Sequence, residues 1–164
     1  MLLSQLLERV ECLAPCPAAE VTGITGDSRK VSPGDVFVCI SGAKTDGHAY
    51  AAAAVAAGAV AVVAERDTGL PGQVLVRDSH TAYSLMCAAF FGYPAERLQV
   101  IGVTGTNGKT TTCFLLKEIL DHAGFQTGLI GTVRNMIGSK QLSSSLTTPD
   151  AFELQSLFAE MLRA

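Results

Sequence analysis

The sequence has no tryptophan, few charged residues and no long, strongly apolar run. Charged residues make up 16% of the 164 residues and hydrophobic residues 48%, a balance that excludes a disordered, collagen-like or coiled-coil chain. The uncharged stretch 49–64 is dominated by alanine, so it falls short of the about 20 strongly apolar residues that span a membrane. We therefore expect a globular protein without a transmembrane helix.

An export signal and paired cysteines are also missing. Residues 1–11 have no basic segment ahead of their apolar residues, and Glu8 and Glu11 stand where a signal peptide would be continuously apolar. The five cysteines are odd in number and form no C-x-x-C pair, which is typical of thiols in a reducing compartment. We therefore expect a cytoplasmic protein without a sulfur-bound metal.

Positive charge is not concentrated in any segment. The formal net charge is −3, and a nucleic-acid surface needs a basic patch that no part of the chain supplies. The composition therefore predicts no nucleic-acid or membrane partner, and we expect a monomer that binds small molecules. Any phosphate group must be held locally.

The first half of the chain alternates between short apolar strands and helices, which predicts an α/β fold. The uninterrupted apolar run 36–40 indicates a strand buried on both faces. A β-α-β unit follows, because the alanine-rich helix ends at Gly58 before the next apolar run. We expect helices over 3–12, 49–57 and from Asp78 or Ser79 to Gly92, and strands over 21–24, 36–40, 59–64 and 74–76.

The pattern starts again near Pro94, and we place a domain boundary there, giving domains 1–96 and 97–164. The second domain is expected to have a strand over 98–103, a glycine-rich loop, a helix over 109–123 and a strand over 127–130. Residues 133–145 are polar and weakly patterned. Thr148 and Pro149 are the expected N-cap and first residue of a final helix.

The glycine-rich loop carries the strongest chemical signal, Gly-Val-Thr-Gly-Thr-Asn-Gly-Lys-Thr-Thr at 102–111. Gly105 and Gly108 allow the backbone to turn successive N–H groups toward an anion at a helix N-terminus. Lys109 adds a positive charge for the β and γ phosphates, and the Thr110 hydroxyl can coordinate Mg²⁺. The loop therefore predicts a nucleotide site in which Lys109 contacts the phosphates and the Thr110 hydroxyl is a candidate Mg²⁺ ligand.

Two other interpretations of the loop fit its residues less well. The pattern G-x-x-x-x-G-K-[ST] has Gly where Val103 stands, but a turn that uses glycine only for geometry would leave Lys109 and the two threonines unexplained. A dinucleotide fingerprint has a different spacing and needs an acid at the end of the next strand. Nucleotide binding through a variant phosphate loop is the better interpretation.

No acid ends an expected strand after Lys109, although a complete ATPase needs one to finish the Mg²⁺ shell. The acids in that stretch fall within or at the start of expected helices: Glu118, Asp121, Asp150, Glu153 and Glu160. We therefore expect 97–164 to be only the opening of a P-loop ATPase-like domain.

Several segments resemble one family. Residues 104–111 resemble the ATP loop of the Mur ligases, which build the peptide of peptidoglycan. Upstream, 27–31, 33–38 and 46–48 are similar to the uridine-nucleotide-binding N-terminal domain of the family. Downstream, 128–135 and 146–150 are most similar to the branch that forms the tripeptide precursor. The resemblance covers the whole chain but only about the first third of such an enzyme.

The resemblance implies an ATP-dependent amide ligase of cytoplasmic peptidoglycan synthesis. It implies addition of meso-diaminopimelate or L-lysine to UDP-N-acetylmuramoyl-L-alanyl-D-glutamate through an acyl phosphate, with ATP and Mg²⁺. The implied substrate-binding residues are Gly26, Ser28, Ala43, Lys44, Thr45, Thr147 and Thr148. The implied ATP-binding residues are Gly105, Thr106, Asn107, Gly108, Lys109, Thr110 and Thr111. The resemblance further implies catalytic roles for Lys109 and Thr110, with Thr110 as the Mg²⁺ ligand.

Alternatives remain open on the residues alone. The chain could be a non-catalytic module that recognises the nucleotide part of the substrate, or part of the related ligase that forms the pentapeptide. Residues 27–29 also fit a plain polar turn, and Thr148 also fits a simple helix cap. His48, His80 and His122 have no paired acid or nucleophile at a useful spacing, so no general-base role is assigned to them.

Overall fold

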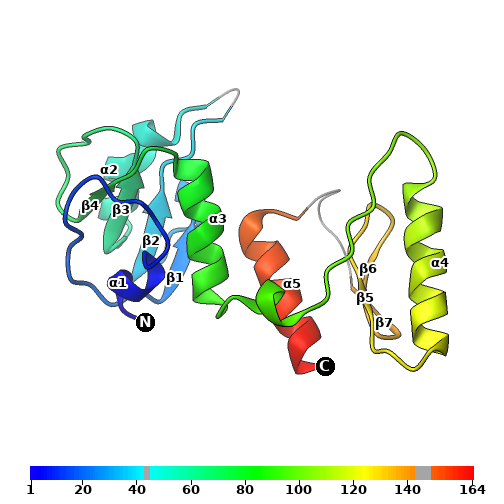
Figure 1. Ribbon diagram of the computed structural model, residues 1–164. Coiled ribbons are helices and arrows are strands. Elements are labelled where there is room, and N and C mark those ends of the chain that lie inside the picture. The colour runs from blue at the N-terminus through cyan, green and yellow to red at the C-terminus, as the bar shows by residue number, and fades with distance from the viewer. Residues whose placement is uncertain (43–44, 143–148) are drawn as a thin grey trace. The chain divides into compact units, whose positions relative to one another are not determined.

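The computed structural model describes residues 1–42, 45–142 and 149–164, and the chain divides into two compact units. The first unit is Met1–Gly92 and the second is Tyr93–Ala164 (Figure 1). The boundary expected from the sequence lies a few residues further along the chain. None of the helices in the described ranges is long and apolar enough to cross a membrane.

A four-stranded, fully parallel sheet forms the centre of the first unit. Its strands lie in chain order: β1 (Gly23–Thr25), β2 (Asp35–Val38), β3 (Ala61–Ala64) and β4 (Gln73–Leu75). The register pairs Ile24 with Val36, and Phe37 with Val62. Because all four strands run the same way, their carboxyl ends meet at one edge of the sheet. That edge, called the carboxyl edge below, carries the loops that follow β1, β2 and β3.

Helices cover both faces of this sheet, which explains the uninterrupted apolar runs of its central strands. On one face, α2 (Ala51–Ala56) packs against Phe37 and Val62 in a buried cluster. Side chains alternate between faces along a strand, so Val36 and Val63 point to the other face, where α1 (Leu3–Leu6) contacts α3 (Ser79–Phe90) (Figure 1). The predicted α/β fold of this unit is confirmed.

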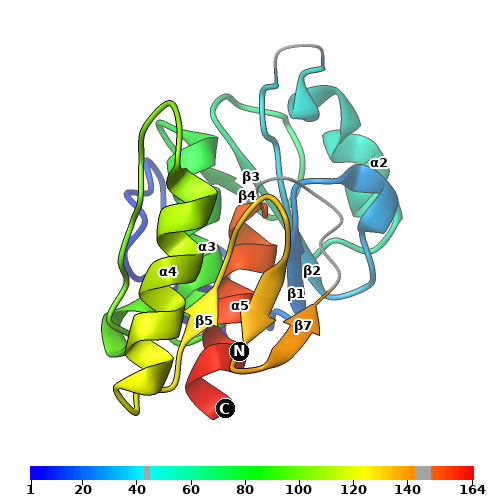
Figure 2. The same ribbon diagram turned by 90° about the vertical axis from the view of Figure 1, so that its right-hand side faces the viewer.

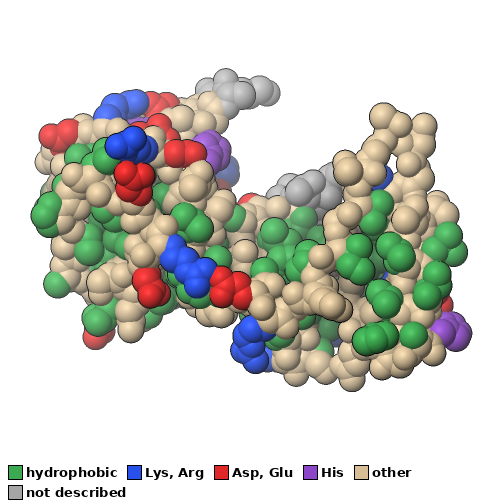
Figure 3. Space-filling model, viewed as in Figure 1, with side chains coloured by type: hydrophobic (Ala, Val, Ile, Leu, Met, Phe, Trp, Pro, Cys, Tyr) green, Lys and Arg blue, Asp and Glu red, His purple; other side chains and the backbone are tan. Residues whose placement is uncertain are grey.

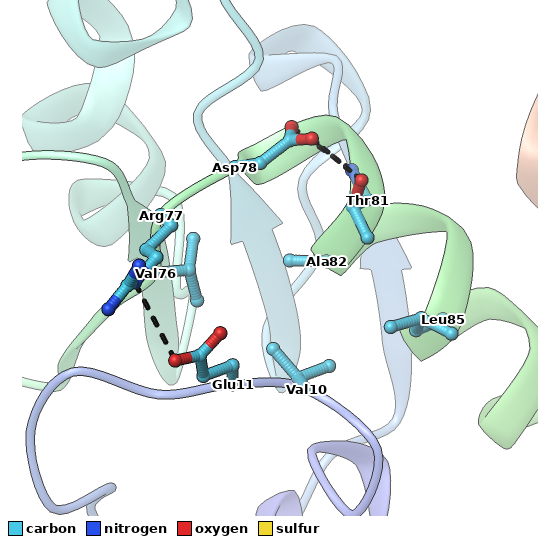
Figure 4. A pocket seen from close by; sticks show the side chains of 8 residues that line it. All are labelled: Val10, Glu11, Val76, Arg77, Asp78, Thr81, Ala82 and Leu85. Atoms are coloured by element: carbon cyan, nitrogen blue, oxygen red, sulfur yellow. Dashed lines mark hydrogen bonds and ion pairs between the residues drawn. The ribbon is translucent and has the colours of Figure 1, made fainter.

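The helix expected over 3–12 is wrong beyond Leu6. From there the chain turns toward the edge strand, where Leu13 N–H donates to the Leu75 carbonyl over 2.8 Å and Cys12 forms an antiparallel bridge with Val76. A backbone ladder with β4 therefore replaces the last helical turns. Val10 and Glu11 of this segment line a hollow of about 120 Å³ together with Val76 and its neighbours. Figure 4 shows the side chains that line it.

The second unit combines two longer helices with a small antiparallel sheet. Its helical elements are η3 (Pro94–Arg97), α4 (Lys109–His122) and α5 (Ala151–Arg163). Its strands are β5 (Gly128–Leu129), β6 (Asn135–Ile137) and β7 (Lys140–Leu142), in that order. α4 contacts β5 (Figure 2). α5 packs against η3. The helix expected over 109–123 is confirmed, and Gly124 follows it with φ +88°.

The strand expected over 98–103 does not form. Val100 and Ile101 are 58% and 61% exposed, and within the described part of the unit this segment pairs with no strand. An apolar run becomes a strand only when a neighbour completes its hydrogen bonds, and β5 to β7 pair with one another instead. An apolar run is therefore not sufficient by itself to form a strand.

Two local features of the tail differ from the prediction. The stretch from Val133, expected to be weakly patterned, contains the hairpin of β6 and β7, whose two-residue turn begins at Gly138 with φ +57°. The final helix begins at Ala151, and its N-cap is Asp150, whose Oδ1 accepts from Glu153 N–H at 2.8 Å. The predicted cap, Thr148, lies outside the described residues, and Pro149 precedes the helix.

Candidate nucleotide-binding sites

The phosphate loop leads directly into α4. Gly105 and Gly108 have φ of +143° and +78°, in the range that favours glycine. Gly108 is the N-cap of α4, and having no side chain it cannot cap the first turn. The N–H groups of that turn and the positive end of the helix dipole therefore face the loop, an arrangement suited to an anion.

Lys109 reaches back across this loop. Its Nζ donates to the Gly105 carbonyl oxygen over 2.6 Å and lies 3.4 Å from the Thr106 carbonyl oxygen. The loop and the first helical turn are exposed to solvent. The structure thus brings together all the residues predicted to bind ATP: Gly105, Thr106, Asn107, Gly108, Lys109, Thr110 and Thr111.

The residues present would give Mg²⁺ one hydroxyl ligand from this loop, on Thr110 in the exposed first turn of α4. As expected, the acids that follow Lys109 lie on helices or at a helix start: Glu118, Asp121, Asp150, Glu153 and Glu160. Within 1–42, 45–142 and 149–164, no three His, Cys, Asp or Glu side chains form a group that could hold a metal. The donor set fits a Mg²⁺ that is carried mainly by the phosphates.

The loops at the carboxyl edge of the first unit carry the described residues that were predicted to bind the uridine nucleotide. Gly26 and Ser28 follow β1, and Thr45 follows β2. A Cβ on Gly26 would lie 2.8 Å from Ile40 Cδ1, so the two loops approach closely at this point. Ala43, Lys44, Thr147 and Thr148 lie outside the described residues.

Asp27 and Arg29 form a fixed pair beside Ser28. The carboxylate caps η1 (Ser28–Lys30) by accepting from Arg29 N–H, and it accepts two further hydrogen bonds of 2.8 Å from Arg29 Nε and Nη2. These bonds lower the pKa of Asp27 from 3.8 to about 2. The Arg29 side chain is 86% exposed, so its guanidinium lies in solvent while the hydrogen bonds to Asp27 fix its orientation.

The prediction that His48 has no paired acid is wrong. His48 Nδ1 lies 2.6 Å from Asp46 Oδ1, because Asp46 caps η2 (Gly47–Tyr50) and folds back onto its helical turn. The Nε2 atom accepts from Glu65 N–H at 3.0 Å, so the proton of the neutral ring is on Nδ1 and points at Asp46. Because Nε2 already accepts a hydrogen bond, the His48 ring links Asp46 to the end of β3 and is not placed as a general base.

The residues after β3 complete this edge. Arg66 forms an ion pair with Asp46, and together with the hydrogen bonds from His48 it holds the pKa of that carboxyl well below its usual range. Glu65 accepts from both the N–H and the hydroxyl of Ser79 at 2.8 Å, which lowers its pKa. Figure 3 shows basic, acidic and histidine side chains gathered at this end of the first unit. The sequence reasoning missed Glu65 and Arg66, although their position directly after a buried strand was a signal.

A parallel sheet with polar loops at its carboxyl edge, followed by a phosphate loop at a helix N-terminus, is typical of nucleotide-binding α/β proteins. Comparison with known proteins gives the family. The family model described as "Mur ligase family, catalytic domain" matches residues 20–103, and that described as "Mur ligase middle domain" matches 103–164. The chain belongs to the Mur ligase family.

Curated relatives share one name, UDP-N-acetylmuramoyl-L-alanyl-D-glutamate–2,6-diaminopimelate ligase. The protein of Clostridium perfringens is 41% identical over 100% of this chain and 35% of its own length. That of Syntrophomonas wolfei is 48% identical over 85% of this chain and 29% of its own length. The chain therefore spans about a third of the length of these relatives.

Solved structures agree with this grouping. A ligase of the same name superposes with a TM-score of 0.78 at 29% identity, covering 99% of this chain and 34% of that protein. A MurF from Acinetobacter baumannii gives a TM-score of 0.59 at 25% identity, over 96% of this chain and 32% of that one. The MurF ligase from Thermotoga maritima, solved in complex with ADP, gives 0.50 at 32% identity, over 62% of this chain and 24% of that one.

Proposed function

We propose that the chain is the substrate- and nucleotide-recognising part of a cytoplasmic, ATP-dependent ligase of peptidoglycan precursor synthesis. The ligase adds a diamino acid, meso-diaminopimelate or L-lysine, to UDP-N-acetylmuramoyl-L-alanyl-D-glutamate. The observation that carries the proposal is the joint presence, in one chain, of the carboxyl-edge loops and the phosphate loop, matched along the whole chain by relatives of that name. Residues 1–96 form the uridine-substrate domain, and 97–164 begin the ATP-binding domain.

The uridine-nucleotide part of the substrate binds at the carboxyl edge. Gly26 and Ser28 follow β1 and Thr45 follows β2, so backbone and hydroxyl groups of two neighbouring loops face one ligand. Polar backbone groups and hydroxyls suit a uracil ring and a ribose better than a fully charged pocket would. Ala43 and Lys44, beside Thr45 in the sequence, are proposed to bind the same part of the substrate, and Thr147 and Thr148 are proposed to contact its sugar-peptide part.

The ATP phosphates bind at the start of α4. In the reaction, an oxygen of the D-Glu side-chain carboxylate attacks the γ-phosphorus, the bond to the β-phosphate oxygen breaks, and ADP leaves. The amine of the diamino acid then attacks the acyl carbon of the acyl phosphate, phosphate leaves, and the nitrogen loses a proton. Lys109 stabilises negative charge on the transferring phosphoryl group, and the Thr110 hydroxyl would hold a bound Mg²⁺, which would supply further charge stabilisation.

A second candidate is a binding module without catalytic activity. It is favoured by one observation, that the acids of the second unit lie on helices or at a helix start and leave the Mg²⁺ shell incomplete. The related pentapeptide-forming ligase is a weaker alternative, because its solved example gives a TM-score of 0.59 against 0.78 for the diaminopimelate-adding enzyme.

Incubation of the 164-residue chain with ATP, Mg²⁺, the UDP-dipeptide and either diamino acid separates these candidates. We expect binding of the UDP-dipeptide and of ADP without phosphate release by this chain, and phosphate release once the sequence is extended to the length of its relatives. An extended protein that binds both nucleotides but releases no phosphate with either diamino acid contradicts the ligase proposal and favours the binding module.

A further inference from the structure

The two ends of the loop after β2 are fixed by one carboxylate. Ser41 and Asp46 form an antiparallel bridge, and Gly42 N–H donates to the Thr45 carbonyl oxygen over 2.9 Å. These four residues are called the loop base below. The Asp46 carboxylate accepts from Ser41 Oγ at 3.2 Å, so it holds the opposite end of the base as well.

The same carboxylate is held from outside the loop. His48 gives it a backbone N–H at 3.0 Å and the ring Nδ1–H at 2.6 Å, and the His48 side chain is 3% exposed. Arg66, at the end of β3, forms an ion pair with the second carboxylate oxygen. An isolated surface ion pair contributes little to stability. Networks contribute more, and here four donors converge on the Asp46 carboxylate.

The network is anchored in rigid elements. His48 Nε2 accepts from Glu65 N–H at the end of β3, and Glu65 is bound to Ser79 at the start of α3. His80 of α3 adds a contact of 3.2 Å between its Nε2 and the Ser41 carbonyl oxygen. The loop base is therefore tied to β3 and to α3 as well as to its own strand.

We propose that Arg66 and His48 are positioning residues, which act through Asp46 to fix the loop base and thereby hold Thr45 in place for a uridine nucleotide. The proposal rests on the proposed function for its ligand. Neither residue needs to touch the nucleotide. Their effect is on affinity, because a loop that is already fixed loses less conformational entropy when the ligand binds.

Arg66 is the better residue to vary, since its side chain is 62% exposed and its loss leaves no buried gap. Arg66→Met keeps the length of the side chain and removes the ion pair, and Arg66→Lys keeps the charge but loses the planar fork. Arg77→Met is the matched control, because Arg77 also follows a strand and pairs with a carboxylate, that of Glu11 at 3.6 Å, away from the loop base.

Two measurements on the full 164-residue chain test the proposal: hydrogen exchange of the Gly42 amide without ligand, and the Kd for UDP. For Arg66→Met we expect exchange and Kd each to rise about five- to tenfold relative to Arg77→Met, with an unchanged melting temperature and partial recovery in Arg66→Lys. Unchanged exchange, or faster exchange with unchanged UDP affinity, overturns the proposal. A wild-type chain that does not bind UDP overturns the proposed function, and the exchange result then decides alone whether Arg66 fixes the loop base.

Discussion

Lys109 Nζ lies 2.6 Å from the carbonyl oxygen of Gly105, so the first residue of α4 reaches back across the phosphate loop. The glycines at 105 and 108 set the backbone of this loop through positive φ values, and the lysine adds the charge. A phosphate bound at the start of α4 would replace the Gly105 carbonyl oxygen as the acceptor of the Lys109 hydrogen bond, because an oxyanion is a stronger acceptor than a carbonyl oxygen.

Replacing Lys109 by alanine should weaken ADP binding by about ten- to a hundredfold, the range expected for a hydrogen bond between charged partners. UDP binding should not change, because its proposed residues Gly26, Ser28 and Thr45 belong to the other unit. Calorimetric titration of each nucleotide checks both expectations. Lys140→Ala is the control, since Lys140 is paired with Glu160 in the same unit. Equal ADP affinity in the two variants would contradict the assignment of Lys109.

Gly47 should tolerate no side chain. A Cβ there would lie 2.6 Å from the Ile40 nitrogen and 2.7 Å from the Ile40 carbonyl oxygen, both backbone atoms that cannot move aside. Gly47→Ala should therefore lower the free energy of unfolding by about 1–3 kcal/mol. Gly42→Ala, where the nearest atom is the Thr45 carbonyl oxygen at 3.5 Å, should have a much smaller effect. Urea titration followed through the amide signals of Met1–Gly92 measures both, and equal losses would refute the packing argument.

The Asp27 carboxylate should give the first unit a pH-dependent stability. Its pKa is lowered from 3.8 to about 2 in the folded protein, so its contribution is fully present above pH 4 and is lost as the pH falls toward 2. The difference in unfolding free energy between wild type and Asp27→Asn should therefore be constant near neutral pH and shrink between about pH 4 and pH 2. Urea titrations across this range test the sign. A difference that grows as the pH falls would be inconsistent with the Arg29 pairing.

Local sequence rules predicted much of the fold. The apolar run at 36–40 predicted a strand buried on both faces, and helices do cover both faces of β2. Asp78, one of the two predicted caps, does cap α3 by accepting from the N–H groups of His80 and Thr81. The phosphate loop could be predicted because its signal is local: the glycines and Lys109 lie within a few residues of one another, at the start of α4.

Features that depend on partners far along the chain were not predicted. Residues 98–103 have the pattern of a strand, but Val100 and Ile101 remain exposed, since a strand requires a neighbouring strand that residue type cannot reveal. Arg66 joins Asp46 from twenty positions away, and only the parallel sheet brings the two together. His48 meets Asp46 because a helical turn begins between them, a change of backbone direction that spacing alone did not indicate.

The most direct measurement is a titration of the ¹⁵N-labelled chain with UDP and, separately, with ADP, followed through its backbone amide signals. UDP should shift the signals of Gly26, Ser28 and the loop base, and ADP should shift those of 105–111. Arg66→Met should weaken only the first response and Lys109→Ala only the second. If UDP shifts no signal at the carboxyl edge, or if both nucleotides shift the same residues, two separate nucleotide sites are not present.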